Sequence, residues 1–352
     1  MKPWTPKTVL TATVATLVAL QGKTLGVIGF GSQGHAHALN LKDKGLKVII
    51  GLQPGSKSRA TAIEAGFEVY PPADVVLMAD VIMIAVPDMK QAALFRDEIE
   101  PNLGDGGKTL LFSHGLAIHF EQIIVPAHTA VVMVAPKGPG HLVRAQALKE
   151  PPQGTPALIA VHQDPMGTGR DIALAWAHGI NSTLAGVLET TFKEETETDL
   201  FGEQTVLCGG VVALIQAGFE VLVEAGYAPE MAYFEVLHEL KLTVDLINQK
   251  GPPGMWFSVS ETAKWGGLTK GPEVLGPDIK DRMRAILTEI QNGTFVNGWA
   301  AEYQAGLPNY TRLLEESKGG LLEQVGQYLR NLMPWLPKVQ TGGSQSEAVF
   351  QA

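Results

Sequence analysis

Two pairs of acidic residues in the second half of the chain have the spacing of a metal site. Asp199 and Glu203 lie four residues apart, as do Glu235 and Glu239. Residues four apart share one face of an α-helix, so each pair sets two carboxylates side by side, at a cost to an isolated helix of roughly 0.2–0.5 kcal/mol. A divalent cation would offset that cost. An oxygen-only ligand set without Cys or His in register favours Mg²⁺ or Mn²⁺ over Zn²⁺.

Spacing alone does not choose these ligands. Glu220 and Glu224 form a further pair four residues apart in the same half, and such pairs are often solvated helix faces. The two pairs above differ in having many apolar neighbours, such as Leu200 and Leu237. Those neighbours predict that the helices are buried. A buried carboxylate needs a cation or a hydrogen-bond donor as its partner.

A glycine-rich motif follows the first apolar run of the chain. Gly29, Gly31 and Gly34 occupy GxGxxG after a predicted strand from Leu25, and a helix is expected to begin near His35. In that context the glycines permit a tight turn, close approach of a pyrophosphate and close helix packing. The motif therefore predicts a dinucleotide site, the alternative being a fortuitous glycine-rich turn.

The kind of dinucleotide depends on the end of the second predicted strand, where NAD-specific proteins usually have an acid for the ribose hydroxyls. Gln53 stands there, and the following Ser56, Lys57, Ser58 and Arg59 supply two hydroxyls and two cations. These groups suit a 2′-phosphate, so NADP is preferred to NAD. A solvated turn with a helix cap at one of the serines is the alternative.

Polar residues also follow three later predicted strands. They are Asp88 with Gln91, then His114, then Lys137. Ligands in open α/β sheets bind at the carboxyl ends of the strands, so these residues face the expected crevice. His114 and Lys137 are placed for proton transfer or anion binding, although each is equally compatible with a solvated loop.

Two patterns of apolar residues divide the chain. Short apolar runs separated by helical stretches predict an α/β Rossmann domain with a parallel sheet, and they occupy 25–30, 47–50, 81–86, 109–112, 130–135 and 157–161. Later residues have helical periodicity, as from Asp199 to Ala225 and from Pro229 to Gln249. The predicted organisation is an N-terminal segment 1–20, a Rossmann domain 21–188, an all-helical domain 189–336 and a flexible tail 337–352.

Composition narrows the choice of function and compartment. The 352 residues are 45% hydrophobic and carry a formal net charge of -9 with no basic block, which argues against a nucleic-acid partner. Cys208 is the only cysteine, so no intrachain disulfide is possible and the cytoplasm is expected. The apolar run from Val9 to Leu20 loosely imitates a signal peptide, but it is too short to span a bilayer, and no membrane association is expected.

Three long strings carry a family resemblance. They are GFGSQGHAHALN from Gly29, ETTFKEETETDLFGEQ from Glu189 and EMAYFEVLHELK from Glu230. Together they resemble ketol-acid reductoisomerases of the shorter, bacterial-type class, in order from about Gln21 to Leu336. The resemblance implies a Rossmann domain followed by a knotted helical domain that interlocks with a second subunit in a homodimer or larger assembly.

The same resemblance implies an activity. Enzymes of this family use NADPH and two Mg²⁺ to convert the acetohydroxy acids 2-acetolactate and 2-aceto-2-hydroxybutyrate to 2,3-dihydroxy acids in branched-chain amino-acid biosynthesis. An alkyl group migrates first, and a hydride then reduces the resulting 2-oxo acid.

By position, the resemblance also assigns individual roles. Asp199 and Glu203 correspond to the first metal ligands, and Glu235 and Glu239, from the neighbouring subunit, to the second. For proton delivery during the reduction, the chemistry leaves two candidates, Glu239 and a metal-bound water. Ser260 matches a residue that holds the substrate carboxylate. The remaining matches are His114 as a catalytic residue, Lys137 and Gly140 in the floor of the crevice, and Phe30, Gly31, Ser32, Gln33, Asp88, Met89, Lys90 and Gln91 as cofactor contacts. Together with Gly140, the motif residues Gly29 and Gly34, and the strand-end residues Gln53, Ser56 and Ser58, these contacts make up the expected cofactor site.

Two departures from the family pattern affect these expectations. The usual acidic N-terminal segment is replaced by residues 1–20, and Gln53 stands where an arginine that grips the 2′-phosphate is commoner. The second departure makes NADH use conceivable, unless Lys57 or Arg59 compensates.

Two other functions remain open from the residues alone. A metal-independent, NADP-dependent 3-hydroxy-acid dehydrogenase also joins a Rossmann domain to a helical one, and a non-catalytic dinucleotide sensor would bind cofactor without turnover. The four carboxylates on apolar helices argue against both.

Overall fold

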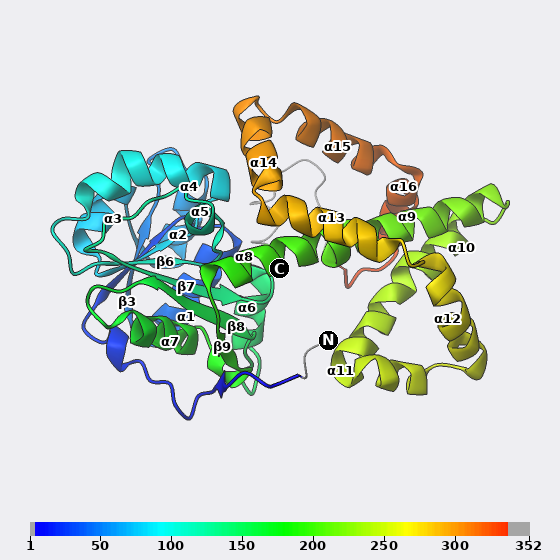
Figure 1. The fold of residues 1–352 in the computed structure, drawn as a ribbon, viewed down its shortest axis with the longest axis horizontal. Helices are drawn as coiled ribbons and strands as arrows, with labels where there is room; N and C mark the ends of the chain where they lie inside the picture. The colour runs from blue at the N-terminus through cyan, green and yellow to red at the C-terminus, as the bar shows by residue number, and fades with distance from the viewer. Residues whose placement is uncertain (1–3, 337–352) are drawn as a thin grey trace. The chain divides into compact units, whose positions relative to one another are not determined.

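The computed structural model describes residues 4–336, which form two compact units, 4–196 and 197–336 (Figure 1). The predicted tail 337–352 lies outside the described residues. The units divide eight residues beyond the predicted domain boundary at 188/189.

The first unit is built on a nine-stranded sheet, and all six predicted strands belong to it. The spatial order is β1-β9-β8-β7-β6-β5-β2-β3-β4. The strands are β1 Val9–Leu10, β2 Thr24–Ile28, β3 Lys47–Gly51, β4 Glu68–Tyr70, β5 Val81–Ile84, β6 Thr109–Phe112, β7 Ala130–Pro136, β8 Ala157–Gln163 and β9 Val187–Glu189.

The expectation of a parallel sheet is confirmed for five of the six predicted strands and is wrong for the sixth, β8. The strands from β7 to β4 run parallel, but β8 is antiparallel to β7, and β1 is antiparallel to β9. Alternation of strands and helices in the sequence does not fix the direction of each strand, because a connection can also return the chain antiparallel beside the strand it left. Strands β1, β4 and β9 are too short to give a sequence pattern, and β1 makes part of the N-terminal segment a sheet edge.

Helices cover both faces of this sheet, which accounts for strands that are apolar on both sides. Neighbouring residues of one strand enter different core clusters: Leu110 belongs to one and Leu111 to the other. The covering helices are α1 Ser32–Asp43, α2 Ser58–Glu64, α3 Pro72–Met78, α4 Asp88–Leu94, α5 Leu116–His119, α6 Gly140–Ala147 and α7 Gly169–Gly179.

One buried polar contact joins two of these helices. Trp176 Nε1 of α7 donates to Nδ1 of His37 in α1 at 3.0 Å. Burial lowers the pKa of His37 to about 3, so this imidazole remains neutral and can accept the indole hydrogen. The contact fixes the packing of the helix that follows the glycine motif.

The second unit is helical, as predicted. It comprises the rest of α8 Phe192–Gly202, the π-helix η5 Glu203–Leu207, α9 Gly209–Glu224, α10 Pro229–Tyr233, the π-helix η6 Phe234–His238, α11 Glu239–Ser258, α12 Glu261–Val274, α13 Ile279–Gln291, α14 Thr294–Gln304, α15 Pro308–Gly319 and α16 Leu321–Asn331. Gly226, with a φ of 91°, follows the end of α9, and Pro229 opens α10. The Gly-Pro-Pro-Gly sequence at 251–254 coincides with a kink inside α11, where Gly251 has a φ of 69°.

The apolar helices of this unit are less covered than expected. Val212 and Val221 of α9 are 55% and 64% exposed, and Leu242 of α11 is 58% exposed. The continuous helical run Phe192–Glu224 is long and apolar enough to cross a membrane by length and composition, which is weak evidence alone, and its apolar stretch is only 6% buried. Around the acidic pairs the prediction of buried helices holds at Leu200, which is 6% exposed, but not at Val206 and Leu207, which are 53% and 68% exposed in the single chain.

Candidate active site

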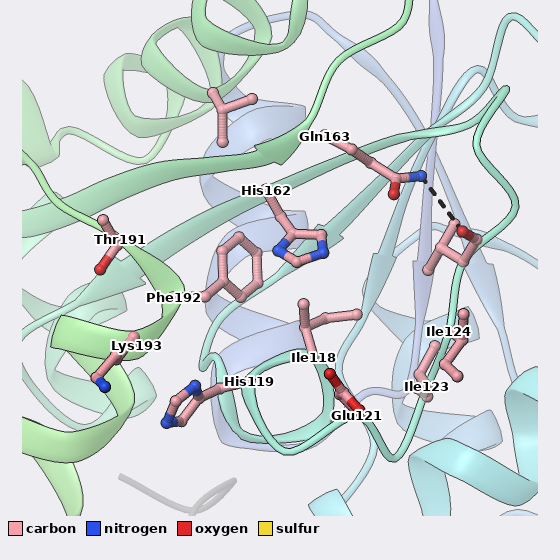
Figure 2. Close-up of a pocket in the computed structure, with 12 residues that line it drawn as sticks. Ile118, His119, Glu121, Ile123, Ile124, His162, Gln163, Thr191, Phe192 and Lys193 are labelled. Carbon is pink, nitrogen blue, oxygen red and sulfur yellow. Dashed lines mark hydrogen bonds between the residues drawn. The ribbon is translucent and has the colours of Figure 1, made fainter. Parts of the chain in front are cut away.

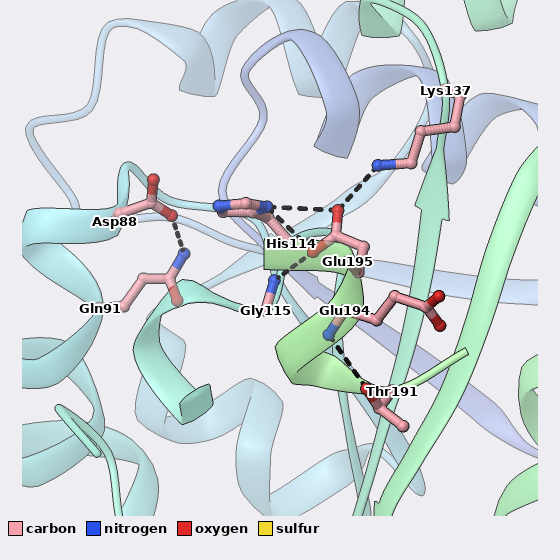
Figure 3. A network of polar contacts seen from close by, with 8 residues as sticks. All are labelled: Asp88, Gln91, His114, Gly115, Lys137, Thr191, Glu194 and Glu195. Carbon is pink, nitrogen blue, oxygen red and sulfur yellow. Dashed lines mark hydrogen bonds and ion pairs between the residues drawn. The ribbon is translucent and has the colours of Figure 1, made fainter. Parts of the chain in front are cut away.

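A buried carboxylate organises the polar residues at one edge of the sheet (Figure 3). Glu195 is 1% exposed in its side chain and accepts a hydrogen bond from Lys137 Nζ at 2.9 Å. Its other oxygen lies 3.1 Å from His114 Nδ1 and accepts the backbone N–H of Gly115 at 3.0 Å. One carboxylate thus joins the two residues for which the sequence predicted proton transfer or anion binding.

Three elements bring these groups together. His114 and Gly115 follow β6, Lys137 follows the adjacent parallel strand β7, and Glu195 lies in the first turns of α8. The positive end of the helix dipole favours an acid there. A Cβ at Gly115 would lie 2.4 Å from Thr196 Oγ1, so only glycine allows α8 to approach β6 this closely.

The surroundings of Glu195 favour its ionised form. Burial by itself raises the pKa of this carboxyl, but the hydrogen bond and charge of His114 and the charge and hydrogen bond of Lys137 together outweigh burial, so the pKa lies below its ordinary value of 4.5. The site therefore contains a fixed negative charge with cationic or polar donors around it.

Glu195 is not among the predicted site residues. It lies 81 positions from His114, so no local motif links the two side chains. Spacing did offer a signal: Glu195 lies four residues before Asp199, which lies four before Glu203. The acidic pair is thus the end of a three-residue stripe, whose first member contacts the sheet edge.

The glycine motif has the geometry expected of a phosphate-binding turn. Gly29 has a φ of 106°, and a Cβ at Gly34 would lie 2.4 Å from Gly29 O, whereas a Cβ at Gly31 would meet nothing within 4 Å. The turn is tight and the helix closely packed, but its outer side is open to a ligand. Helix α1 begins at Ser32, three residues before the predicted start at His35.

The predicted cofactor residue Gly140 packs directly against this turn. A Cβ there would lie 2.1 Å from Ser32 O. Two hydrogen bonds hold the contact: His141 N donates to Ser32 Oγ at 3.2 Å, and Gln33 Nε2 donates to Gly138 O at 3.0 Å. The start of α6 is therefore part of the same crevice as the glycine motif.

The residues after β5 lie at the same edge of the sheet as the glycine motif and His114. Gln91 Nε2 donates to Asp88 Oδ1 and to Val86 O, both at 3.1 Å, which fixes the first turn of α4 with Met89 and Lys90. In the sheet β5 lies between β2 and β6. The structure thus brings the glycine motif, the Asp88 turn and His114 to neighbouring parallel strand ends.

The predicted 2′-phosphate residues lie after β3. Ser56 N donates to Gln53 O at 2.9 Å, which closes a turn before α2. The Arg59 guanidinium donates to Val69 O of β4 at 3.1 Å and is half-buried. Ser56 and Ser58 are half-buried at the same turn.

The four acids of the predicted metal site lie in the second unit. Asp199 is half-buried, and Glu203, Glu235 and Glu239 are exposed. Glu203 begins the π-helix η5, Glu235 lies inside the π-helix η6, and Glu239 directly follows η6. Single π-turns often mark functional sites, a signal that helical periodicity could not provide.

Ser260, the predicted substrate residue, has a structural contact. It is the N-cap of α12, and its Oγ accepts the backbone N–H of Ala263 at 3.2 Å. The side chain is exposed, so its hydroxyl proton can still be donated to a ligand.

A separate pocket of about 470 Å³ lies elsewhere in the first unit (Figure 2). Its lining includes His119, Glu121, His162, Phe192 and Lys193. Gln163, which also lines it, pairs with Val131 at the amino end of β7. None of the predicted site residues lines this pocket, so it is distinct from the edge described above.

Two family models together match most of the chain. Residues 19–186 match the model of the acetohydroxy acid isomeroreductase NADPH-binding domain, and residues 192–335 match the model of the ketol-acid reductoisomerase C-terminal domain. The chain belongs to the ketol-acid reductoisomerase family. The predicted resemblance is thereby confirmed, and the chain is assigned to a family of NADP-dependent oxidoreductases.

Individual members of the family are similar over almost their whole length. The chain is 55% identical over 324 residues to a ketol-acid reductoisomerase (NADP(+)) from Mycobacterium avium, covering 92% of this chain and 96% of the relative. A relative of the same name from Petrotoga mobilis is 53% identical over 322 residues, covering 92% of this chain and 97% of the relative.

Solved structures agree with the fold. An NADH-preferring ketol-acid reductoisomerase from an uncultured archean superposes with a TM-score of 0.89 at 44% identity, covering 92% of this chain and 99% of that one. A semialdehyde dehydrogenase NAD-binding protein from Cupriavidus necator has a TM-score of 0.60 at 16% identity, over 77% of this chain and 99% of that one. The second likeness concerns the fold alone.

Replacing the buried carboxylate should destabilise the protein in a pH-dependent way. Because the folded pKa of Glu195 is lowered, its stabilising effect is present above pH 4.5 and is lost as pH falls through the folded pKa. We expect Glu195→Gln to lower the free energy of unfolding at pH 7 by about 1–3 kcal/mol. Urea unfolding of both proteins across pH 3–7 measures the difference, which should shrink on acidification.

The matched control is the neighbouring acid. Glu194 forms an ion pair with Lys7 at 2.8 Å in which both side chains are about half exposed, so Glu194→Gln should change stability by less than about 1 kcal/mol. Equal stability of Glu195→Gln and the unmodified protein at pH 7 would refute the assigned role of the carboxylate.

Proposed function

We propose that this protein catalyses the Mg²⁺-dependent conversion of 2-acetolactate and 2-aceto-2-hydroxybutyrate to 2,3-dihydroxy acids with NADPH, in branched-chain amino-acid biosynthesis. The observation that carries the proposal is the Glu195 network. It joins His114 and Lys137 at the strand ends to α8, whose next turns carry Asp199 and Glu203. Helix α8 therefore begins beside the strand ends that carry His114 and Lys137, and the same helix carries Asp199.

The acidic residues fit the chemistry of Mg²⁺. Their donor atoms are carboxylate oxygens, two residues on each of two helical runs, with a π-turn at each pair. Hard oxygen ligands suit Mg²⁺, and two ions need several carboxylates for charge balance. We assign Asp199 and Glu203 to the first set of ligands, and Glu235 and Glu239 to the second.

The side chains of the site would act through position and proton transfer. Bound Mg²⁺ would supply Lewis acidity for the substrate hydroxyl that is deprotonated and for the carbonyl oxygen that gains charge. Glu195 holds Lys137 and His114 at the strand ends by direct contacts. We assign proton delivery during reduction to Glu239, and organisation of the proton network to His114 and Lys137. Ser260 would donate its hydroxyl proton to the substrate carboxylate.

The glycine motif and its neighbours would hold the dinucleotide. The open side of Gly31 accepts the pyrophosphate, and the remaining predicted contacts, from Phe30 to Gln33 and from Asp88 to Gln91 with Gly140, surround it at adjacent strand ends. Ser56 and Ser58 offer hydroxyl donors for a 2′-phosphate. NADPH is the proposed cofactor, with NADH use permitted by Gln53, and one related structure is named as NADH-preferring.

We propose further that two chains form the functional unit. The exposed apolar residues of α9 and α11, such as Val212, Val221 and Leu242, leave a surface that a second copy can cover. Glu235 and Glu239 would then complete the site of the partner chain, in an interlocked, knotted dimer or larger assembly. We place this assembly in the cytoplasm, consistent with a single cysteine.

The reaction is tested most simply by cofactor oxidation. With 2-acetolactate and Mg²⁺, the purified protein should oxidise NADPH, and chelation of divalent ions should abolish turnover because the carboxylates then have no cation to bind. Absorbance at the nicotinamide band measures both rates. Chelator-insensitive reduction of an oxo acid would instead support a metal-independent 3-hydroxy-acid dehydrogenase, and cofactor binding without turnover would support a sensor.

Sharing of the site between subunits predicts complementation. Asp199→Asn and Glu239→Gln should each be inactive alone. In a mixed dimer one site carries both changes and the other carries neither, so co-expression of equal amounts should restore about a quarter of the activity. Activity per milligram of the co-expressed protein, with each variant alone as control, measures this. Absence of recovery, despite mixed dimers isolated through two affinity tags, would contradict the shared site.

A further inference from the structure

A carboxylate from a distant element reaches the position where the sequence lacks an acid. The side-chain amide of Gln53 donates a hydrogen bond to Glu98 Oε1. Gln53 lies two residues beyond the end of β3, and Glu98 belongs to η2, the π-helix Phe95–Ile99 that follows α4. The two residues are 45 positions apart, so no local motif reveals the contact.

The π-helix is anchored so that Glu98 remains at this place. Phe95 and Ile99, on either side of it, are 4% and 0% exposed and belong to the core on one face of the sheet. Asn102 Nδ2 donates to the backbone carbonyl of Glu98 at 2.9 Å. Glu98 itself is half-buried. Its carboxylate is thus presented by a fixed backbone rather than by a loop.

The side chains at the end of the second strand of a Rossmann domain determine whether it prefers NAD or NADP. At the end of the second strand of a Rossmann domain, an acid accepts hydrogen bonds from the ribose hydroxyls of NAD, whereas cations and hydroxyl donors favour the 2′-phosphate of NADP. The Gln53 amide is the donor that would otherwise reach a phosphate here, and it is engaged by Glu98. A carboxylate at the same place repels a 2′-phosphate.

We infer that Glu98 is a specificity-determining residue, which supplies the strand-end acid in place of residue 53 and lowers the preference for a 2′-phosphorylated dinucleotide. It does so in two ways: it holds the Gln53 amide, and it places negative charge beside the ribose. Ser56 and Ser58 oppose it, because their hydroxyls remain at the adjacent turn. The balance between them sets the ratio of NADPH to NADH use. This inference rests on the proposed binding of NADPH.

The inference can be tested by binding, separately from turnover. Adenosine 2′,5′-bisphosphate and 5′-AMP differ only in the 2′-phosphate, and calorimetric titration of the full-length protein gives the affinity for each. We expect Glu98→Gln to raise the ratio of affinities in favour of the bisphosphate by about tenfold. The ratio of kcat/KM for NADPH and NADH should move in the same direction, through KM rather than kcat.

A second variant shows whether the two residues act together. In Gln53→Arg the new guanidinium would pair with Glu98, so the gain in bisphosphate affinity should be small. The double variant Gln53→Arg/Glu98→Gln should exceed the product of the two single effects. Glu100→Gln is the control for charge alone, because Glu100 is an exposed acid two residues further on, and it should leave the ratio unchanged.

The outcomes separate this inference from the proposed reaction. An affinity ratio that is the same in Glu98→Gln and the unmodified protein, with both folded, would overturn the role of Glu98 even if acetolactate is turned over. An equal shift in Glu100→Gln would also overturn it, because the effect would then be general electrostatics. A changed ratio without any turnover would leave the role of Glu98 standing and refute the proposed reaction.

Discussion

A glutamate carboxylate that is 1% exposed needs hydrogen bonds and positive charge, because an uncompensated ion in the protein interior costs several kcal/mol. Glu195 meets this requirement with Lys137, His114 and the Gly115 amide, which come from the ends of two adjacent strands. The arrangement therefore constrains both the sheet edge and the start of α8.

The sequence predicted which residues belong to this site better than it predicted the contacts between their side chains. The strand-turn-helix around Gly29, the strand ends that carry His114 and Lys137, and the spacing of Asp199 and Glu203 are local patterns, and local patterns can be read from periodicity. Contacts between distant segments cannot. The partner of His114 is 81 residues away and that of Gln53 is 45 away, and neither acid belongs to a motif with its partner.

Strand direction and helix burial could not be predicted from the sequence either, because both also depend on distant segments. The reversal of β8 depends on how the chain returns beside β7, and the exposure of α9 depends on what else covers it. The apolar periodicity of a helix predicts that one of its faces is buried. It does not distinguish burial within one chain from burial by a second copy. The uncovered helices and exposed acids of the second unit are consistent with the latter.

Carbon NMR titration of glutamate-labelled protein would show directly whether the folded protein holds Glu195 ionised between His114 and Lys137. The carboxyl resonance of Glu195 would be identified as the one that is absent from the spectrum of Glu195→Gln. We expect the carboxyl of Glu195 to titrate below its ordinary pKa of 4.5, and its pKa to rise in Lys137→Met. A carboxyl that titrates at or above 4.5, unaffected by the loss of Lys137, would contradict this expectation.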